Sequence, residues 1–346
     1  MRIGVVAPLV APLAERQPYG KHVFLCDLAR GLARRGHEVV VYAAERSRVS
    51  GVKVAPVAVD PRVRGRFALR RRATDAESRI MGEAFARLYD RARRERPDVL
   101  SQHAYDRAAI EGAAEFPALN TLHLPPLGDE VVEAARSSPA ALCTVSGACA
   151  RLWREATGRE VESLPNGVPD LPLPDGAPLP SAIIAGRISR EKGTAAAIRV
   201  ARRAGLAPLV VGEVHDEAYF HAEVAPELVG IEVHSTVTRE ALRAMMARAV
   251  VTLMPVEWDE PFGLVAAESQ VAGCPVAGYR RGALPEVVEE GVGGHLVAPG
   301  DEAALAAAIE SARHLDRARI RREALARFGL EACLDRYERC LERIAA

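Results

Sequence analysis

Residues 2–44 contain the pattern that decides the fold: the apolar run RIGVVAP (2–8), the amphipathic segment VFLCDLARGLARRG (23–36) and a second apolar run HEVVVYAA (37–44). Both apolar runs are rich in valine, which is typical of strands buried on both faces. The segment between them has helical periodicity and ends at Gly36. A strand, a helix and a strand in this order predict a parallel sheet with helices on both faces.

The same alternation continues through the first half of the chain. Helices are predicted at 76–94 and 147–157, and strands at DVLSQH (98–103), ALNTLHL (118–124) and ALCTVS (141–146). The alternation stops at LPNGVPDLPLPDGAPLP (164–180), where six prolines follow Leu164. Since proline interrupts both helices and sheet ladders, this segment is predicted to be an interdomain linker.

A second β/α series follows the linker. It begins with the strand SAIIAGRI (181–188); further strands are predicted at 207–213, 231–235, 250–256, 275–279 and 294–300, and helices at 239–249, 263–273 and 301–314. A chain of 346 residues also exceeds one ordinary core. The predicted fold class is therefore α/β, with two Rossmann-like, doubly wound domains (1–165 and 181–325) facing a cleft. A linker at 166–180 joins them, and a C-terminal helix at 326–346 is expected to pack back on the first domain.

The net charge of the chain is zero, which gives no general signal for nucleic-acid binding. The charge is unevenly distributed, however. Residues 1–165 hold 26 Lys and Arg against 20 Asp and Glu, a net charge of +6, and the remainder holds 20 against 26. The basic half is compatible with an anionic ligand, with a membrane surface, or with an uneven surface that has no function.

The six cysteines are scattered and include no C-x-x-C pair. This spacing predicts a reducing, cytoplasmic environment, cysteines packed as small apolar residues, and no zinc site. The N-terminal apolar run is broken by Pro8 and Pro12, so a first strand is a better interpretation than a signal peptide. No run of 18 apolar residues occurs, and no membrane span is predicted.

The stretch EWDEPFGLVAAESQVAGCP (257–275) contains two glutamates eight residues apart, Glu260 and Glu268. A predicted strand ends before it, and a helix is predicted to start at Gly263. The free N–H groups and the dipole of that helix favour an anion, and glycine lets a phosphate approach the backbone. Both carboxylates would then accept hydrogen bonds from sugar hydroxyls. The alternative is that Glu260 only balances the helix dipole and Glu268 is solvated.

A second candidate site is AGRISREKG (185–193), which follows the first strand of the second series. Arg187 and Lys192 would bring two cations to a strand end, where they could neutralise a diphosphate. Lysine is scarce in this chain, with only Lys21, Lys53 and Lys192, so its presence here is informative. The alternative is a solvated basic loop.

The first half offers QPYGKHVF (17–24), in which Gly20 opens a predicted helix. His103 and His123 end two predicted strands and would converge at one edge of the sheet, either as functional groups or as structural hydrogen-bonding partners. The first half also contains an arginine cluster, which is either a solvated stretch or an anion site: Arg62, Arg64, Arg66, Arg70, Arg71 and Arg72.

Taken together, these segments resemble the retaining glycosyltransferases of family 4, which have the two-domain GT-B fold. EPFGLVAAE (260–268) resembles the E-x7-E motif of that family, and GRISREKG (186–193) resembles its phosphate-binding loop. LPNGV (164–168) is similar to its interdomain turn, and RGHEVVVY (35–42) to its second strand. The resemblance extends over nearly the whole chain and implies an N-terminal acceptor domain and a C-terminal donor domain.

The resemblance also implies a role for individual residues. Arg187 and Lys192 would bind the donor diphosphate, with the amides of Gly263 and Leu264 and with Gly20. Glu260 would bind the hydroxyls of the transferred sugar, and Glu268 the ribose. The remaining candidates are His123 and Phe262 at the sugar, Val237 at the base, and Tyr19, Lys21, His22 and His103 on the acceptor side. His123, Glu260, Arg187 and Lys192 would be the catalytic set.

The resulting prediction is a retaining hexosyltransferase that moves a sugar from a nucleotide-diphosphate sugar to a hydroxyl of a small-molecule acceptor. A UDP-sugar is favoured over a GDP-sugar, and neither a cofactor nor a metal is expected. Tyr19-Gly20 stands where the family usually has two glycines, and this departure affects the assignment of the acceptor side. Two alternatives stay open: a peripheral-membrane transferase with a lipid acceptor, which would contact the membrane through the arginine cluster, and a nucleotide-sugar binding protein without catalysis.

Overall fold

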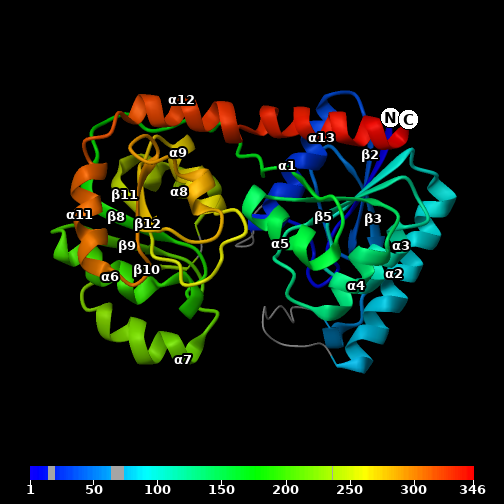
Figure 1. The fold of residues 1–346 in the computed structure, drawn as a ribbon, viewed down its shortest axis with the longest axis horizontal. Helices are drawn as coiled ribbons and strands as arrows, with labels where there is room; N and C mark the ends of the chain where they lie inside the picture. Colours follow the sequence, from blue (N-terminus) through cyan, green and yellow to red (C-terminus); the bar gives the residue numbers. More distant parts are fainter. Residues whose placement is uncertain (15–19, 64–73, 236) are drawn as a thin grey trace. The chain divides into compact units, whose positions relative to one another are not determined.

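The structure is a computed structural model, and it describes residues 1–14, 20–63, 74–235 and 237–346. The chain forms two compact units, residues 1–167 with 333–346, and residues 168–332. Each unit is built around one parallel sheet with helices on both faces (Figure 1). The predicted fold class, two Rossmann-like α/β domains, is confirmed by this arrangement.

Within the described residues, the sheet of the first unit has seven strands in the order β3-β2-β1-β4-β5-β6-β7, and every neighbouring pair is parallel. The strands are β1 (Arg2–Val6), β2 (Glu38–Ala44), β3 (Lys53–Val57), β4 (Val99–Gln102), β5 (Ala118–Leu122), β6 (Ala141–Thr144) and β7 (Glu162–Ser163). The strand order reverses between β1 and β4. In such sheets a crevice opens at this reversal, at the carboxyl ends of the strands.

Five helices follow strands of this sheet or connect them: α1 (Gly20–Arg34), α2 (Asp75–Glu95), α3 (Arg107–Ala113), α4 (Asp129–Ser137) and α5 (Gly147–Thr157), with a short 3₁₀ turn at Pro61–Val63. Phe85 and Leu88 of α2 pack under the strands in one apolar cluster. Trp153 of α5 packs in another, and its Nε1 donates to the carbonyl of Leu124 at 2.8 Å. Burial of these faces holds the helices on the sheet.

The helix predicted at 326–346 is two helices, α12 (Arg317–Phe328) and α13 (Leu330–Ala345). They are separated at Gly329, whose ψ of 146° is extended and ends the helical path. Residues 333–346 belong to the first unit. There Leu334 lies over Gly31 of α1, where an added Cβ would come within 2.5 Å of the leucine side chain. Arg35 forms ion pairs with Asp335 and Glu338, each at 2.8 Å.

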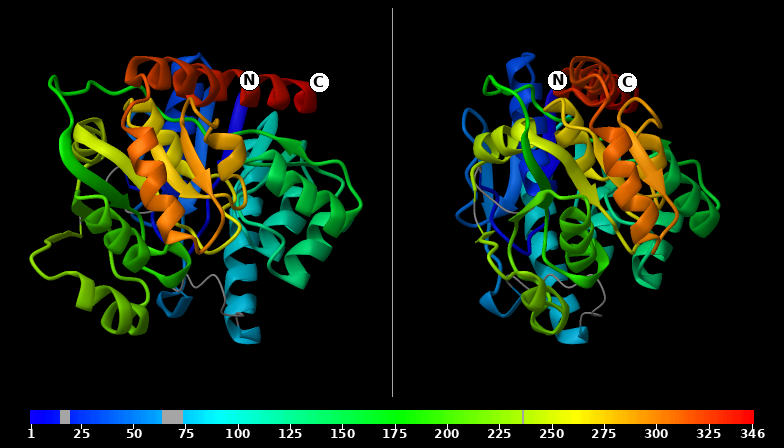
Figure 2. Two further views of the ribbon diagram at one scale, coloured as in Figure 1. Left: turned by 60° about the vertical axis from the view of Figure 1, so that its left-hand side comes forward. Right: turned by 90° about the vertical axis from the view of Figure 1, so that its left-hand side faces the viewer.

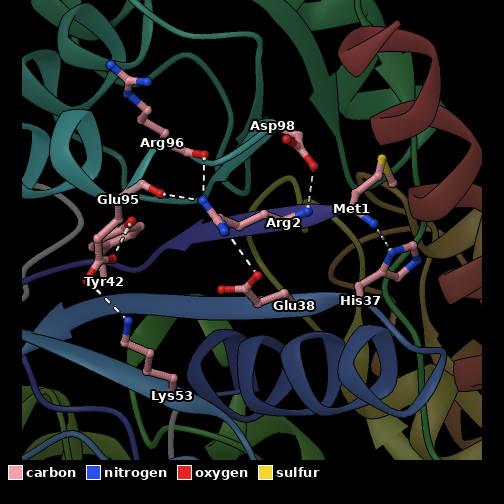
Figure 3. Close-up of polar contacts among 9 residues, drawn as sticks. All are labelled: Met1, Arg2, His37, Glu38, Tyr42, Lys53, Glu95, Arg96 and Asp98. Atoms are coloured by element: carbon pink, nitrogen blue, oxygen red, sulfur yellow. Dashed lines mark hydrogen bonds and ion pairs between the residues drawn. The ribbon is translucent and has the colours of Figure 1, made fainter.

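Polar contacts hold strands β1, β2 and β3 to the end of α2 (Figure 3). The backbone N–H of Arg2 donates to Asp98 at 2.7 Å, and its guanidinium donates to the carbonyl of Glu95 at 2.9 Å. The hydroxyl of Tyr42 and Nζ of Lys53 reach the two carboxylate oxygens of Glu95, at 2.9 and 3.4 Å. Lys53, one of the three lysines, therefore serves as an exposed structural partner at the amino edge of this sheet.

Within the described residues, the sheet of the second unit has six strands in the order β10-β9-β8-β11-β12-β13, again all parallel. The strands are β8 (Leu179–Ala185), β9 (Ala207–Val211), β10 (Val233–His234), β11 (Ala249–Met254), β12 (Val276–Tyr279) and β13 (Gly294–Val297). The order reverses between β8 and β11. Strand β8 begins at Leu179, inside the segment predicted as linker, because Leu179 pairs with Ala249 of β11.

The helices of the second unit divide between the two faces of its sheet. α6 (Thr194–Arg203) and α11 (Glu302–Ala312) share one apolar cluster with the strands, and α8 (Arg239–Arg248) lies in the cluster on the other face (Figures 1 and 2). α9 (Leu264–Val271) packs against α8 and α12. The remaining helical pieces are α7 (Glu217–Tyr219), a π-helical turn at Phe220–Val224, a 3₁₀ turn at Ala225–Glu227, one at Arg190–Lys192, and α10 (Leu284–Val287).

All six cysteines lie in the described part of the chain, are buried and form no disulfide, as predicted for apolar packing. Burial raises the pKa of the Cys333 thiol to about 12 and that of Cys340 to about 11. Across the described ranges, no helix is both long and apolar enough to cross a bilayer.

Candidate active site

The two sequence motifs of the second half meet at the strand-order reversal of the second unit. Strands β8 and β11 are neighbours in the sheet, and each motif begins where one of them ends. Lys192, in the loop after β8, and Glu260, in the loop after β11, are 68 residues apart in sequence. Their side chains form an ion pair, with 2.5 Å between Nζ and Oε2. The motifs therefore build one site at the edge where ligands bind in open α/β sheets.

Glu260 is buried and held by two donors on the same oxygen. Besides Lys192, Nε1 of Trp258 donates to Oε2 at 2.8 Å. The ammonium group of Lys192 also lies 5.2 Å from the centroid of the Trp258 ring, within the range of a cation–π interaction. The side chain of Lys192 is 21% exposed and that of Glu260 11%, so solvent reaches both in part. The pair therefore offers a fixed hydrogen-bond acceptor, the Glu260 carboxylate, beside a fixed cation, the Lys192 ammonium, to a ligand with hydroxyl or phosphate groups.

The backbone of Glu260 is positioned by the loop that follows β12. Gly282 has a φ of 56°, and an added Cβ there would lie 2.3 Å from the backbone nitrogen of Glu260. The next residue, Ala283, donates its N–H to the carbonyl of Glu260 at 2.8 Å. Glycine is needed at position 282 because any side chain would displace the backbone that presents the carboxylate.

Helix α9 begins directly after this loop. Gly263 precedes it with a φ of 87°, and Leu264 is its first residue. The first N–H groups of the helix have no partner within the helix and lie next to Glu260 in the chain. The start of α9 thus offers backbone donors and the positive end of a helix dipole beside the Lys192–Glu260 pair.

The loop after β8 is fastened to the end of β11. Gly193 has a φ of 67°, and an added Cβ would lie 2.1 Å from the carbonyl oxygen of Pro255. The N–H of Glu257 donates to the carbonyl of Glu191 at 2.9 Å. The carboxylate of Glu191 in turn binds the guanidinium of Arg187, with 3.3 Å between Nη2 and Oε1. The alternative of a solvated basic loop is wrong, because these contacts hold both cations in place.

Glu268 lies inside α9 and is 9% exposed, so the alternative of a solvated helix residue is also wrong. Its Oε1 faces two guanidinium groups of α8, with Nη2 of Arg243 at 3.5 Å and Nη2 of Arg239 at 3.7 Å. Burial lowers the pKa of Arg243, whose side chain is 1% exposed, and the carboxylate of Glu268 opposes this shift. Sequence reasoning missed both arginines. Their i, i+4 spacing in REALRAMMARA (239–249) was the available signal.

Two predicted ligand residues lie in packed surroundings. Phe262 is buried, and its ring meets Phe328 edge-on at 5.8 Å, so its side chain supports the loop from within the unit. Val237 is half-buried against the apolar cluster between β8 and α8, two residues before Arg239, the first residue of α8. Both side chains therefore have apolar packing partners within the second unit.

In the first unit, His103 and His123 converge as predicted. Nδ1 of His103 lies 2.9 Å from Nε2 of His123, and Nε2 of His103 lies 2.8 Å from the hydroxyl of Ser101. Both histidines are buried and follow the carboxyl ends of β4 and β5. The rings of Phe24 and Tyr337 pack around them. The pair forms a preorganised polar group at the reversal edge of this sheet.

Of the other candidate residues of the first half, the structure describes only some. Gly20 is the first residue of α1, and His22 is buried on the same helix. Arg62 is exposed and pairs with Asp60 at 2.7 Å. Tyr19 and the remaining arginines of the cluster (Arg64, Arg66, Arg70, Arg71 and Arg72) lie outside the described residues, as does the side chain of Lys21. Over the described ranges, no three His, Cys, Asp or Glu side chains gather as a metal site would require.

Comparison with known proteins identifies the family. The family described as "Glycosyl transferases group 1" matches residues 178–329. The family described as "Glycosyltransferase Family 4" matches residues 20–170. The chain is 28% identical over 372 residues to a glycogen synthase of Mycobacterium tuberculosis, covering 91% of this chain and 87% of that protein. A shorter region is 40% identical over 79 residues to a D-inositol 3-phosphate glycosyltransferase of Streptomyces griseus, which corresponds to 23% of this chain and 16% of that protein.

Solved structures share the fold over the full length. A sucrose-phosphate synthase from Thermosynechococcus elongatus superposes with a TM-score of 0.79 at 18% identity, covering 99% of this chain and 98% of that one. HepE of Anabaena, solved in complex with UDP-glucose, superposes with a TM-score of 0.76 at 19% identity, covering 99% and 100%. The two family matches span most of both units. In the second unit, the contact between Lys192 and Glu260 joins the two sequence motifs. The chain therefore belongs to the group 1 glycosyltransferases, which have the GT-B fold.

Proposed function

We propose that this protein transfers a hexose from a nucleotide-diphosphate sugar, with a UDP-sugar favoured over a GDP-sugar, to a hydroxyl of a small-molecule acceptor, with retention and without an essential metal. The observation that supports this best is the 2.5 Å contact between Lys192 and Glu260 at the strand-order reversal. It places a cation for phosphate next to a carboxylate for sugar hydroxyls. Support for a UDP-sugar comes from HepE, a structural relative solved with UDP-glucose.

The donor subsite follows from the positions of these groups. Arg187, Lys192 and the N–H groups of Gly263 and Leu264 would bind the diphosphate. Glu260, with the backbone at Phe262 and Gly263, would bind the sugar hydroxyls. Glu268 would accept hydrogen bonds from the ribose, and Arg239 and Arg243 keep its carboxylate oriented. Val237 would contact the base.

The chemistry is departure of the nucleoside diphosphate. Negative charge grows on the leaving phosphate, and Arg187, Lys192 and the amides at the start of α9 would stabilise that charge. Glu260 would hold the sugar by its hydroxyls while positive character develops at the anomeric carbon. The acceptor hydroxyl would then attack from the face that the diphosphate leaves, which retains the anomeric configuration.

The acceptor would bind to the first unit, for which Tyr19, Lys21, His22 and His103 are the candidates. The net charge of +6 over residues 1–165 suits an anionic acceptor, such as a phosphorylated sugar or polyol. His103 is held between Ser101 and His123, so it would fix the orientation of the His123 ring within the first unit.

A donor screen by thermal shift tests this function. UDP-, GDP-, ADP- and dTDP-sugars are added to the purified protein, and the Tm is measured. A donor at a hundredfold excess over its Kd stabilises by about 2.7 kcal/mol, which raises the Tm by several degrees. We expect a UDP-sugar to give the largest rise and Glu268→Gln to reduce it. NMR of the product should show an unchanged anomeric configuration. A protein that binds a donor but neither transfers nor hydrolyses its sugar would contradict catalysis.

Excess EDTA should leave the transfer rate unchanged within about twofold. The physical reason is that cationic side chains and helix N–H groups can stabilise the leaving diphosphate without an ion. The measurement is the initial rate before and after chelation, with added Mg²⁺ or Mn²⁺ as the reverse test. Loss of activity that returns on adding either ion would refute the metal-independent mechanism.

A further inference from the structure

Strands β8 and β9 continue past their formal ends as a short parallel pair. The N–H of Gly186 donates to the carbonyl of Val211 at 2.9 Å, and that of Ile188 donates to the carbonyl of Glu213 at 2.8 Å. The N–H of His215 then donates back to the carbonyl of Ile188 at 3.0 Å. These bonds define a parallel bridge in which Ile188 pairs with Val214. The loop containing Arg187 is thereby fixed in register against residues 213–215.

This register places three polar side chains on one face. Ile188 is buried and Val214 packs against the same apolar cluster, so both point into the unit. Side chains alternate along a strand, and paired residues of parallel strands point to the same face. Arg187, Glu213 and His215 therefore point to the opposite face. Their side chains are 21%, 38% and 23% exposed, so they are confined but open to a ligand.

The surroundings of His215 disfavour its protonated form. The pKa of His215 is lowered, first by burial and second by the positive charge of Arg187. Two carboxylates oppose the shift, Glu213, whose Oε2 lies 4.0 Å from Nε2 of His215, and Glu191, which pairs with Arg187. An anion that binds to Arg187 would cancel the repulsion that the imidazolium meets. A diphosphate bound to Arg187 would therefore favour the protonated, positively charged form of His215.

We propose that His215 is a second, titratable anion-binding group of the diphosphate subsite and takes up a proton when a donor binds to Arg187. The inference rests on the proposed function, because it takes the ligand of Arg187 to be the diphosphate of a sugar nucleotide. It adds a residue that lies outside both sequence motifs, on the neighbouring strand.

The sign of the coupling follows from linkage. A donor that raises the pKa of His215 binds most tightly to the protein in which His215 is already protonated. Affinity is therefore highest below the lowered pKa of the free protein. It falls as pH rises through the interval between the free and the bound pKa, and it is constant above both. A difference of one pKa unit between the two states corresponds to a tenfold change in Kd.

The test is calorimetric titration of UDP-glucose into the protein between about pH 5.5 and pH 8, in two buffers of different ionisation enthalpy. The diphosphate diester of UDP-glucose does not titrate in this range. We expect the wild-type protein to bind about three- to tenfold more tightly at the acid end and to take up a fraction of one proton per donor. His215→Gln should bind with a nearly constant Kd and without proton uptake. Its fold should persist, since His215 contributes to the ladder through its backbone.

Two further variants make the result specific. His221→Gln is the matched control, because His221 is a histidine of the same unit that is 74% exposed and pairs with Glu217; it should behave as the wild-type protein. Glu213→Gln removes a group that raises the pKa of His215, and it should move the pH profile to lower pH. Proton uptake that persists in His215→Gln would overturn the inference and leave the proposed function standing. If UDP-glucose, GDP-mannose and ADP-glucose all fail to bind the wild-type protein, the proposed function fails, and the inference with it.

Discussion

Lys192→Met should lower kcat for sugar transfer by about 10- to 1,000-fold, or about 1 to 4 kcal/mol of barrier. The ammonium group of Lys192 contacts Glu260 at 2.5 Å and lies at the strand end where the diphosphate is proposed to leave. Methionine keeps the length of the side chain and removes the charge that would stabilise the leaving group. The measurement is kcat and KM with the donor identified by the thermal-shift screen.

Lys53→Met is the matched control for this variant. Lys53 also forms an ion pair with a glutamate, Glu95 at 3.4 Å, but it is 59% exposed and lies at the amino edge of the other sheet. Exposed pairs of this kind contribute little, and we expect kcat to stay within about twofold. The Tm of both variants should be recorded, so that unfolding is separated from lost chemistry. Full activity in a folded Lys192→Met protein would contradict the phosphate role of Lys192.

Gly193→Ala should lower the free energy of unfolding by about 2 to 4 kcal/mol and abolish most transfer activity. Alanine at the φ of 67° costs about 1 to 2 kcal/mol. The rest comes from the new Cβ, which would lie 2.1 Å from the carbonyl oxygen of Pro255 and force the loop away from β11. Lys192 precedes Gly193 and would move with it, so the contact with Glu260 would be lost. Chemical denaturation and the transfer rate measure the two effects.

Gly205→Ala separates backbone strain from the close approach. Gly205 has nearly the same φ, 69°, and lies in the same unit, but an added Cβ would have no neighbour within 4 Å. It should cost only the strain of about 1 to 2 kcal/mol and leave the transfer rate intact. Equal losses of stability in the two variants would show that the approach to Pro255 contributes nothing.

Local patterns in the sequence were enough to predict most helices and strands. The helix at 147–157 is an example: Ser146 accepts a hydrogen bond from the N–H of Cys149 at its start, and Gly158 ends it with a φ of 68°. Each of these signals acts within a few residues, so it is readable along the chain. The break at Gly329 was missed because the residues on both sides are good helix formers, and a single extended ψ interrupts them.

The candidate site was predictable to the level of its motifs. Gly263 and the apolar run after it predict a helix start beside Glu260. The scarcity of lysine in the chain indicated that Lys192 has a role. The sequence also indicated that His103 and His123 end strands. It did not indicate that Lys192 and Glu260 touch, since that contact depends on β8 and β11 being neighbours in the sheet.

The sequence by itself determined the order of strands and helices, the two-part organisation and the residue types at the strand ends. Tertiary structure alone decided which of these residues meet: Glu268 with Arg243, His103 with His123, and Arg187 with the face that holds His215. The physical reason is the range of the interactions. Periodicity, capping and proline effects act over one or two turns of the chain. Ion pairs and strand register join residues that lie tens of positions apart, and only the packed sheets bring them together.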